Sequence, residues 1–156
     1  YMAVKGGSPN CYGVWGNPET ARIWVVVETE RDAKYLFQEL EPYGLFGTMG
    51  IGTAQMAPDA YAHSLLHKAD FVINALDNDK PGTVAAWRLG DAPRRFSWNG
   101  TYPHSIRWPV PKRFGKDAGD TAGKLPVWEW ISAALPPAVA AGCEKTAANA
   151  AHAAQE

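Results

Sequence analysis

The sequence has 156 residues, a formal net charge of −1 and 46% apolar residues, including seven tryptophans. This size and apolar content favour one folded domain with its own core and exclude a disordered polymer, while the near-neutral charge excludes a molecule whose overall field attracts nucleic acid. The only two cysteines, Cys11 and Cys143, exclude a disulfide framework or a zinc knuckle. Because the sequence shows no membrane-length apolar run and no signal peptide, we expect a cytoplasmic protein.

Three segments differ in composition. Residues 1–20 are rich in Gly, Pro and Asn and predict a lead-in, in which residues 11–15 could add an edge strand. Residues 21–135 predict the domain itself. Residues 136–156 are mostly Ala, and we expect them either to fray or to form a helix that packs on a neighbour. Because the chain opens on Tyr1 rather than Met, we expect it to be part of a longer protein.

The first half of the domain predicts two strands and two helices. The β-branched run at 22–27 is typical of a strand covered on both faces. Residues 31–41 carry an apolar stripe at helical spacing, made by Ala33, Leu36, Phe37 and Leu40.

A second strand is predicted at 44–48, followed by a Gly-rich turn at 47–52. A helix is then predicted from about Pro58, a residue suited to a first helical position. Its sheet-facing residues would be Tyr61, Leu65, Ala62 and Leu66.

The second half continues the alternation. The apolar run at 71–76 predicts a third strand, and Pro81 with Gly82 would open a short helix through Trp87, which Gly90 would end. A weaker fourth strand at 105–108 leads through a loop at 112–120 to a closing helix at 127–134. Strands that alternate with helices predict an α/β fold, with about four strands in a mainly parallel sheet.

Acidic residues follow two of these strands. Glu28 ends the first strand, and Asp77 and Asp79 follow the third. In a parallel sheet these carboxylates emerge at the edge where ligands bind, and three crowded carboxylates repel one another unless a cation is present. Oxygen ligands favour Mg²⁺ or Mn²⁺. The simpler interpretation is that acids end strands because loops are polar.

Four stretches, taken in order, resemble the Toprim family, and most of all the catalytic core of bacterial and phage DNA primases. VVVETERDA resembles the first motif, a strand that ends in Glu (Glu28) with an Asp four residues later (Asp32). NALDNDKPGTVAA resembles the Asp-x-Asp motif, FGTMGIGTA the Gly-containing turn between them, and GKDAGD the final Lys-Asp segment with Lys116, Asp117 and Asp120. The resemblance covers about residues 21–121, but Thr29 stands where the family usually has Gly.

The resemblance implies a Rossmann-like Toprim fold and a metal-dependent nucleotidyltransferase of DNA replication. Glu28, Asp77 and Asp79 would be catalytic and would bind Mg²⁺ or Mn²⁺, with Asp32 and Asp117 near a second ion. The implied partners are a single-stranded DNA template, nucleoside triphosphates and a helicase. Primases of this kind add a zinc-binding domain and a basic subdomain, so we expect these residues to bind metal without priming alone.

A basic stretch lies near the end of the domain. Lys116, Lys112, Arg113 and Arg107 are candidates for phosphate contact, although a solvated basic rim would have the same composition. Trp98 and Trp108 are the candidates for base stacking. The other tryptophans on strand or helix patterns are predicted core residues: Trp24, Trp87, Trp128 and Trp130.

Two alternative functions use the same residues. The first is a Toprim nuclease or a topoisomerase-like strand-cleaving domain, and the second is a catalytically silent module that binds DNA or docks a partner. A separate feature is His63 and His67, one helical turn apart, which could share zinc but are more often just a helix surface.

Overall fold

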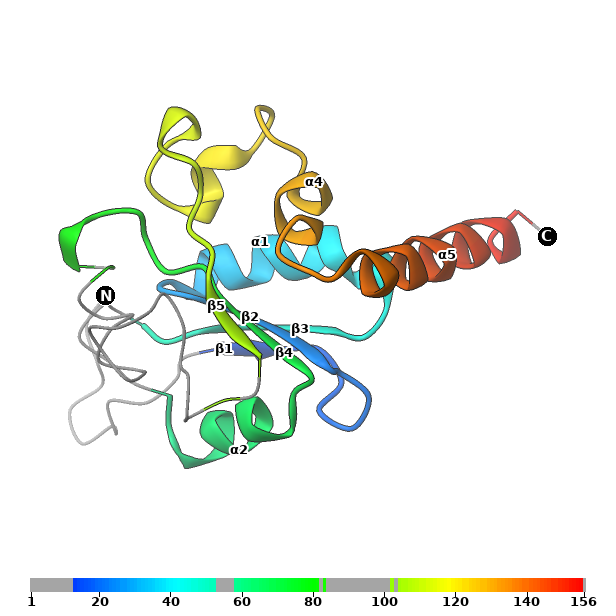
Figure 1. The fold of residues 1–156 in the computed structure, drawn as a ribbon, viewed down its shortest axis with the longest axis horizontal. Helices are drawn as coiled ribbons and strands as arrows, with labels where there is room; N and C mark the ends of the chain where they lie inside the picture. The colour runs from blue at the N-terminus through cyan, green and yellow to red at the C-terminus, as the bar shows by residue number, and fades with distance from the viewer. Residues whose placement is uncertain (1–12, 53–57, 82, 84–101, 103, 156) are drawn as a thin grey trace.

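The computed structural model describes residues 13–52, 58–81, 83, 102 and 104–155. The fold is α/β, with a five-stranded, mostly parallel mixed sheet flanked by helices (Figure 1). The strand order is β1-β3-β2-β4-β5. The strands are β1 (Gly13–Trp15), β2 (Ile23–Val27), β3 (Phe46–Gly50), β4 (Phe71–Asn74) and β5 (Ser105–Arg107).

The sheet is parallel except at one edge. β2 pairs in parallel with both β3 and β4, and β4 pairs in parallel with β5. The edge strand β1 runs antiparallel to β3. The predicted α/β class and mainly parallel sheet are therefore confirmed, and the stretch expected to add an edge strand supplies the fifth strand.

Two apolar layers cover the sheet because residues of β2 alternate between its faces. Ile23, Val25 and Val27 pack on α1 (Glu30–Leu40), α4 (Val127–Ser132) and the start of α5 (Pro137–Ala153). Trp24 and Val26 pack on α2 (Ala60–Lys68), which lies below the sheet in Figure 1, opposite α1 and α4.

The helix α1 begins where the sequence places a capping residue. The Thr29 hydroxyl accepts a hydrogen bond from the Asp32 backbone N–H at 3.2 Å and so satisfies one of the free donors of the first turn. The residue that departs from the family pattern is therefore the N-cap of α1. The predicted stripe is confirmed for Ala33, Leu36 and Leu40, which are fully buried.

Two details near β3 and α2 differ from the predictions. Gly47 and Gly50 lie inside β3 rather than in a turn. Both positions need glycine, because the Trp24 ring and the backbone at Thr29 occupy the space that side chains there would fill. Tyr61 is 55% exposed, so the prediction that it faces the sheet is wrong; the buried face of α2 consists of Ala62, Leu65 and Leu66.

The C-terminal segment forms a helix whose first half packs on this domain, whereas fraying or a helix that packs on a neighbour was predicted. α5 has 17 residues and follows three 3-10 turns, η1 (Glu41–Tyr43), η2 (Lys112–Phe114) and η3 (Ala118–Thr121), and the helix α4. Its first half is anchored, since Cys143 is buried in the core and Trp128 Nε1 donates to Glu144 at 3.1 Å. Beyond Thr146 most of the helix is exposed.

Candidate metal and phosphate site

The parallel register brings the predicted acids to one edge of the sheet. Val26 of β2 is paired with Asn74 of β4, and the Ala75 N–H continues the ladder by donating to the Val26 carbonyl at 2.8 Å. Glu28 and Asp77 therefore leave neighbouring strands at their carboxyl ends, where α/β sheets bind ligands.

The loop after β5 returns to this edge and is fixed there by Asn78. Its backbone N–H donates to the Lys116 carbonyl at 2.7 Å, and its side-chain amide donates to the Val110 carbonyl at 2.7 Å. No role was predicted for Asn78, the residue between the two aspartates. Its position in the Asp-Asn-Asp stretch was the available signal, since Asn often bonds to loop backbone.

Lys116 bridges the two aspartates. Its Nζ lies 3.5 Å from Asp77 Oδ2 and 3.4 Å from Asp79 Oδ2. The two aspartates raise the pKa of Lys116, and the Asp77 charge is the largest single cause. The predicted phosphate contact thus forms ion pairs with two of the predicted metal ligands.

Asp77 is held in a strongly anionic environment. Its side chain is buried, and burial, then the Glu28 charge, raise its pKa to about 7, although Lys116 acts in the opposite direction. A carboxyl that ionises only near neutral pH marks a position where a further positive charge would be stabilising.

Asp32 and Glu28 have buried oxygen atoms without hydrogen bonds. Both carboxylate oxygens of Asp32 and the Oε2 atom of Glu28 accept none from the described residues. Burial raises the pKa of Asp32 and the Asp117 charge adds to the increase, while the Thr29 hydroxyl and the Gly119 backbone N–H, which lie close to the carboxylate without forming a well-aligned hydrogen bond, act in the opposite direction. Arg31 Nε lies 3.8 Å from Asp32 Oδ1 but on an exposed side chain. Buried acceptors without donors are uncommon, and an ordered water or a bound cation at this position would satisfy them.

The turn η3 places Asp117 next to Asp32. A Cβ atom on Gly119 would lie 2.9 Å from Asp32 Oδ1 and 3.2 Å from Asp117 Oδ1, so a residue without a side chain is needed here. Asp117 is the N-cap of η3 and accepts from the Asp120 N–H at 3.0 Å. The structure thus brings together Asp32 and Asp117, the two residues that were predicted near a second ion.

Asp120 has a structural role in the same turn. Its Oδ2 atom accepts hydrogen bonds from the backbone N–H groups of Lys116 at 2.7 Å and Asp117 at 3.3 Å. These donors lower its pKa. Asp120 therefore shapes the loop that carries Lys116.

Arg107 requires a correction. It was predicted to contact phosphate, but it is 6% exposed and its guanidinium donates to the backbone carbonyls of Leu76 and Asp77, the latter at 2.8 Å. Burial lowers its pKa to about 10 even though Asp77 acts in the opposite direction. Because β4 ends at Asn74, these carbonyls have no strand partner, and Arg107 satisfies them and fixes the segment that carries Asp77.

Lys112 and Arg113 lie on η2 and are exposed. Arg113 lies over the Phe114 ring at 4.8 Å. Their contact with phosphate stays a prediction, and both are on the loop that also carries Lys116.

The predictions made for the tryptophans have different outcomes. Trp24 and Trp130 are buried, as predicted, and Trp128 is half-buried and stacked on Tyr43 at 3.9 Å. Trp87 and Trp98 lie outside the described residues, as does the end of the helix predicted through Trp87; Lys80, Pro81 and Thr83 have helical backbone.

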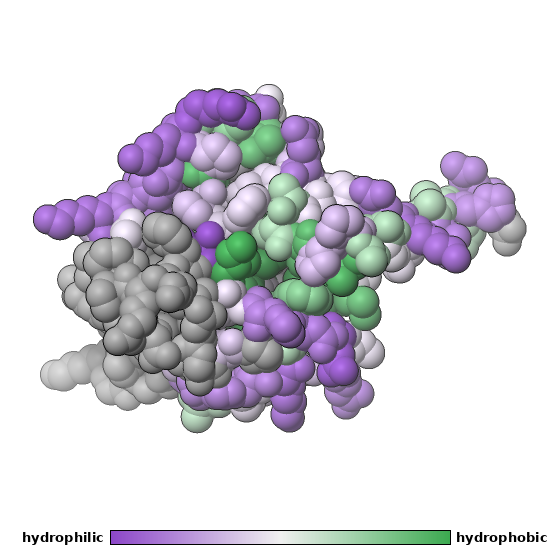
Figure 2. All heavy atoms as spheres, viewed as in Figure 1, coloured by the Kyte–Doolittle hydropathy of each residue, from purple (hydrophilic) through white to green (hydrophobic). Residues whose placement is uncertain are grey.

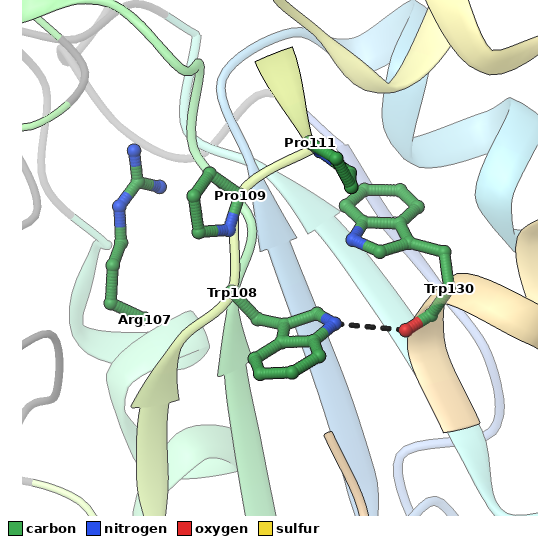
Figure 3. Close-up of a pocket in the computed structure, with 5 residues that line it drawn as sticks. All are labelled: Arg107, Trp108, Pro109, Pro111 and Trp130. Atoms are coloured by element: carbon green, nitrogen blue, oxygen red, sulfur yellow. Dashed lines mark hydrogen bonds between the residues drawn. The ribbon is translucent and has the colours of Figure 1, made fainter. Parts of the chain in front are cut away.

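Trp108 lines an apolar cavity of about 360 Å³ (Figure 3). Its Nε1 donates to the Trp130 carbonyl at 2.8 Å, and Pro109 and Pro111 complete the lining, while the Arg107 guanidinium points away from the two indoles. Figure 2, viewed as Figure 1, shows apolar residues gathered at the centre of the visible face and bordered by hydrophilic ones. Trp108 is fixed within the fold, and base stacking by it stays a prediction.

The oxygen ligands have the chemistry that suits a hard divalent ion, but they do not form a complete coordination shell. Among the residues described, no three His, Cys, Asp or Glu side chains are arranged to hold one ion. The buried oxygens without donors on Glu28 and Asp32, and the raised pKa of Asp77, are nevertheless features that a cation would relieve.

Comparison of the chain with protein-family models, with curated proteins and with solved structures gave no match. Within the described part of the chain, no helix combines the length and the apolar content needed to cross a membrane.

Proposed function

We propose that this chain is a Toprim domain that performs metal-dependent nucleotidyl transfer, as in the primer synthesis of DNA primases. The observation that carries this proposal is the position of Glu28 and Asp77 at the carboxyl ends of neighbouring parallel strands, with Asp79 and Lys116 beside Asp77. The pKa of Asp77, raised by burial and by Glu28, supports it. A scaffold without catalysis has no need for such crowding, which costs stability whenever the acids are ionised.

Asp77 and Asp79 would hold Mg²⁺ or Mn²⁺, with Glu28 beside them. The bound ion would supply charge neutralisation at the phosphoryl group and alignment of the attacking and leaving oxygens. Glu28 would complete the ligand set or accept the proton of the attacking hydroxyl. Asp32 and Asp117 would orient a second ion or its water molecules.

Lys116 would then contact the phosphate. Its side chain is 58% exposed and lies between the aspartates and solvent, so it can turn toward an incoming triphosphate. Lys112 and Arg113, on the same loop, would add positive charge for the template backbone. The partners would be nucleoside triphosphates and single-stranded DNA, with a helicase in the complete replication machinery.

The first test is a Mn²⁺ titration of the 156-residue chain, followed by electron paramagnetic resonance. We expect binding that is lost in the double variant Asp77→Asn/Asp79→Asn and retained in the control Asp70→Asn, an exposed aspartate paired with Arg22. Equal binding by all three proteins would overturn the proposed metal site.

A second test separates the reactions. The chain, and any longer natural protein that contains it, is given nucleoside triphosphates with a single-stranded template, or supercoiled plasmid with Mn²⁺. Template-dependent synthesis by a longer protein, lost in the double aspartate variant, supports primase chemistry. Plasmid cleavage without synthesis would overturn it in favour of a nuclease.

A further inference from the structure

Two histidines on α2 have their ring nitrogens directed at one another. The Nε2 atoms of His63 and His67 are 3.1 Å apart, and the rings meet edge to face with centroids separated by 4.5 Å. The helix sets this arrangement, since residues four apart lie on the same face. His63 is half-buried and His67 is exposed, so the space between them opens to solvent.

Tyr102 fixes the His63 ring. Its hydroxyl is hydrogen-bonded to His63 Nδ1, and its side chain is 4% exposed and belongs to the core layer that contains Leu65 and Leu66 of α2. It also packs edge-on against His67, with centroids 5.2 Å apart. In the tautomer in which Nδ1 donates to the hydroxyl, the lone pair of His63 Nε2 faces His67.

We propose that His63 and His67 chelate one transition-metal ion of the kind that imidazole prefers, with Zn²⁺ and Cu²⁺ as the best candidates, and that Tyr102 is the positioning residue. Metal–nitrogen bonds of about 2.0–2.1 Å place two nitrogens on one ion roughly 3 Å apart, which is the separation found here. Metal-bound histidines commonly donate their second ring N–H to a neighbouring acceptor, the position that Tyr102 occupies.

The remaining coordination positions would belong to water or a small ligand, because no third His, Cys, Asp or Glu among the described residues completes the group. The ion would be held by α2 alone, and Tyr102, just before β5, would contact both rings. This site differs from the acidic site in chemistry, since nitrogen ligands do not favour Mg²⁺, and in position, since α2 covers the face of the sheet opposite α1.

The test is calorimetric titration of the metal-free chain with ZnCl₂ and nitrogen hyperfine coupling in the spectrum of bound Cu²⁺. We expect one site whose affinity falls at least about 100-fold in His67→Ala and in His63→Ala, and about 10- to 100-fold in Tyr102→Phe. The control His152→Ala, on α5, and the double variant Asp77→Asn/Asp79→Asn should keep the site.

His67 is exposed, so its replacement leaves the fold intact even if a Tyr102 variant is unstable; circular dichroism of each metal-free variant checks this. Bound Zn²⁺ should also raise the melting temperature of the parent chain but not of His67→Ala. Unchanged Zn²⁺ affinity in His67→Ala, or no binding at millimolar Zn²⁺, would show that the pair is only a hydrogen bond and would overturn the proposal. Neither result bears on Mn²⁺ binding at the acidic site.

Discussion

The ammonium group of Lys116 lies 3.5 Å from Asp77 Oδ2, at the edge of the sheet where β2 and β4 end. Lys116 thus supplies a positive charge at the position where the proposed mechanism places a divalent ion. In the metal-free protein this lysine stabilises the ionised carboxylates. It must move away when the same oxygens bind an ion.

Replacement of Lys116 by Met should therefore strengthen metal binding. With the competing charge removed, we expect Mn²⁺ affinity in the absence of nucleotide to rise roughly three- to tenfold. A Mn²⁺ titration measures this, and Lys124→Met, an exposed lysine two residues beyond Ala122, is the matched control. Weaker Mn²⁺ binding by Lys116→Met would show that the lysine supports the ion rather than competes with it.

Asp77 should make stability depend on pH. Its pKa is raised from 3.8 in the unfolded chain to about 7. The folded state thus holds the proton more tightly, and this contribution is complete below about pH 4 and is lost as the pH rises through about 7.

Asp77→Asn removes this titration. In EDTA, the melting temperature of the variant minus that of the parent should increase between pH 5 and pH 8. Each kcal/mol of unfolding free energy that the parent loses over this range corresponds to about 2–4 °C. Asp32 titrates in the same direction, so the pH dependence of the variant is reduced rather than abolished. Glu39→Gln, exposed on α1, is the control. A constant difference across this range would contradict the raised pKa.

The arrangement of distant segments could be predicted from the sequence where a local pattern determined each segment's structure. The continuous apolar run before Glu28 and the one before Asp77 each predict a buried parallel strand, and the parallel order then brings their terminal acids together. The stripe of α1 was equally clear from its helical spacing. In these segments local preference and tertiary packing agree.

The differences occur where a distant residue decides the structure. Gly47 and Gly50 have the sequence of a turn, but they lie in β3, where the Trp24 ring and the Thr29 backbone leave no room for a side chain. Arg107 has the sequence of a surface cation, yet it is buried because carbonyls beyond β4 need donors. No local pattern contains this information, since the partner lies about 30 residues away in the chain, as with Asp77 and Arg107.

Arg107 should be important for stability. Arg107→Lys keeps the charge but not the planar fork that reaches the Leu76 and Asp77 carbonyls. Leaving these buried acceptors unsatisfied should lower the free energy of unfolding by about 2–4 kcal/mol, measured by urea denaturation. Arg113→Lys, on the exposed η2, should change it by less than about 0.5 kcal/mol. Equal small effects would show that the Arg107 guanidinium is not needed to satisfy these carbonyls.

A pair of glycine replacements tests how tightly the sheet is packed. In Gly47→Ala the new Cβ would lie 2.4 Å from the Trp24 ring. Because Trp24 is 1% exposed, the ring cannot move away without disturbing the α2 layer, and overpacking should cost about 1–3 kcal/mol. Gly142→Ala has nothing within 4 Å and lies inside α5, so the lower helix propensity of glycine predicts a gain of about 0.5–1 kcal/mol. Urea denaturation measures whether each replacement lowers or raises the free energy of unfolding. Stabilisation by Gly47→Ala would mean that β3 and Trp24 are not packed as described.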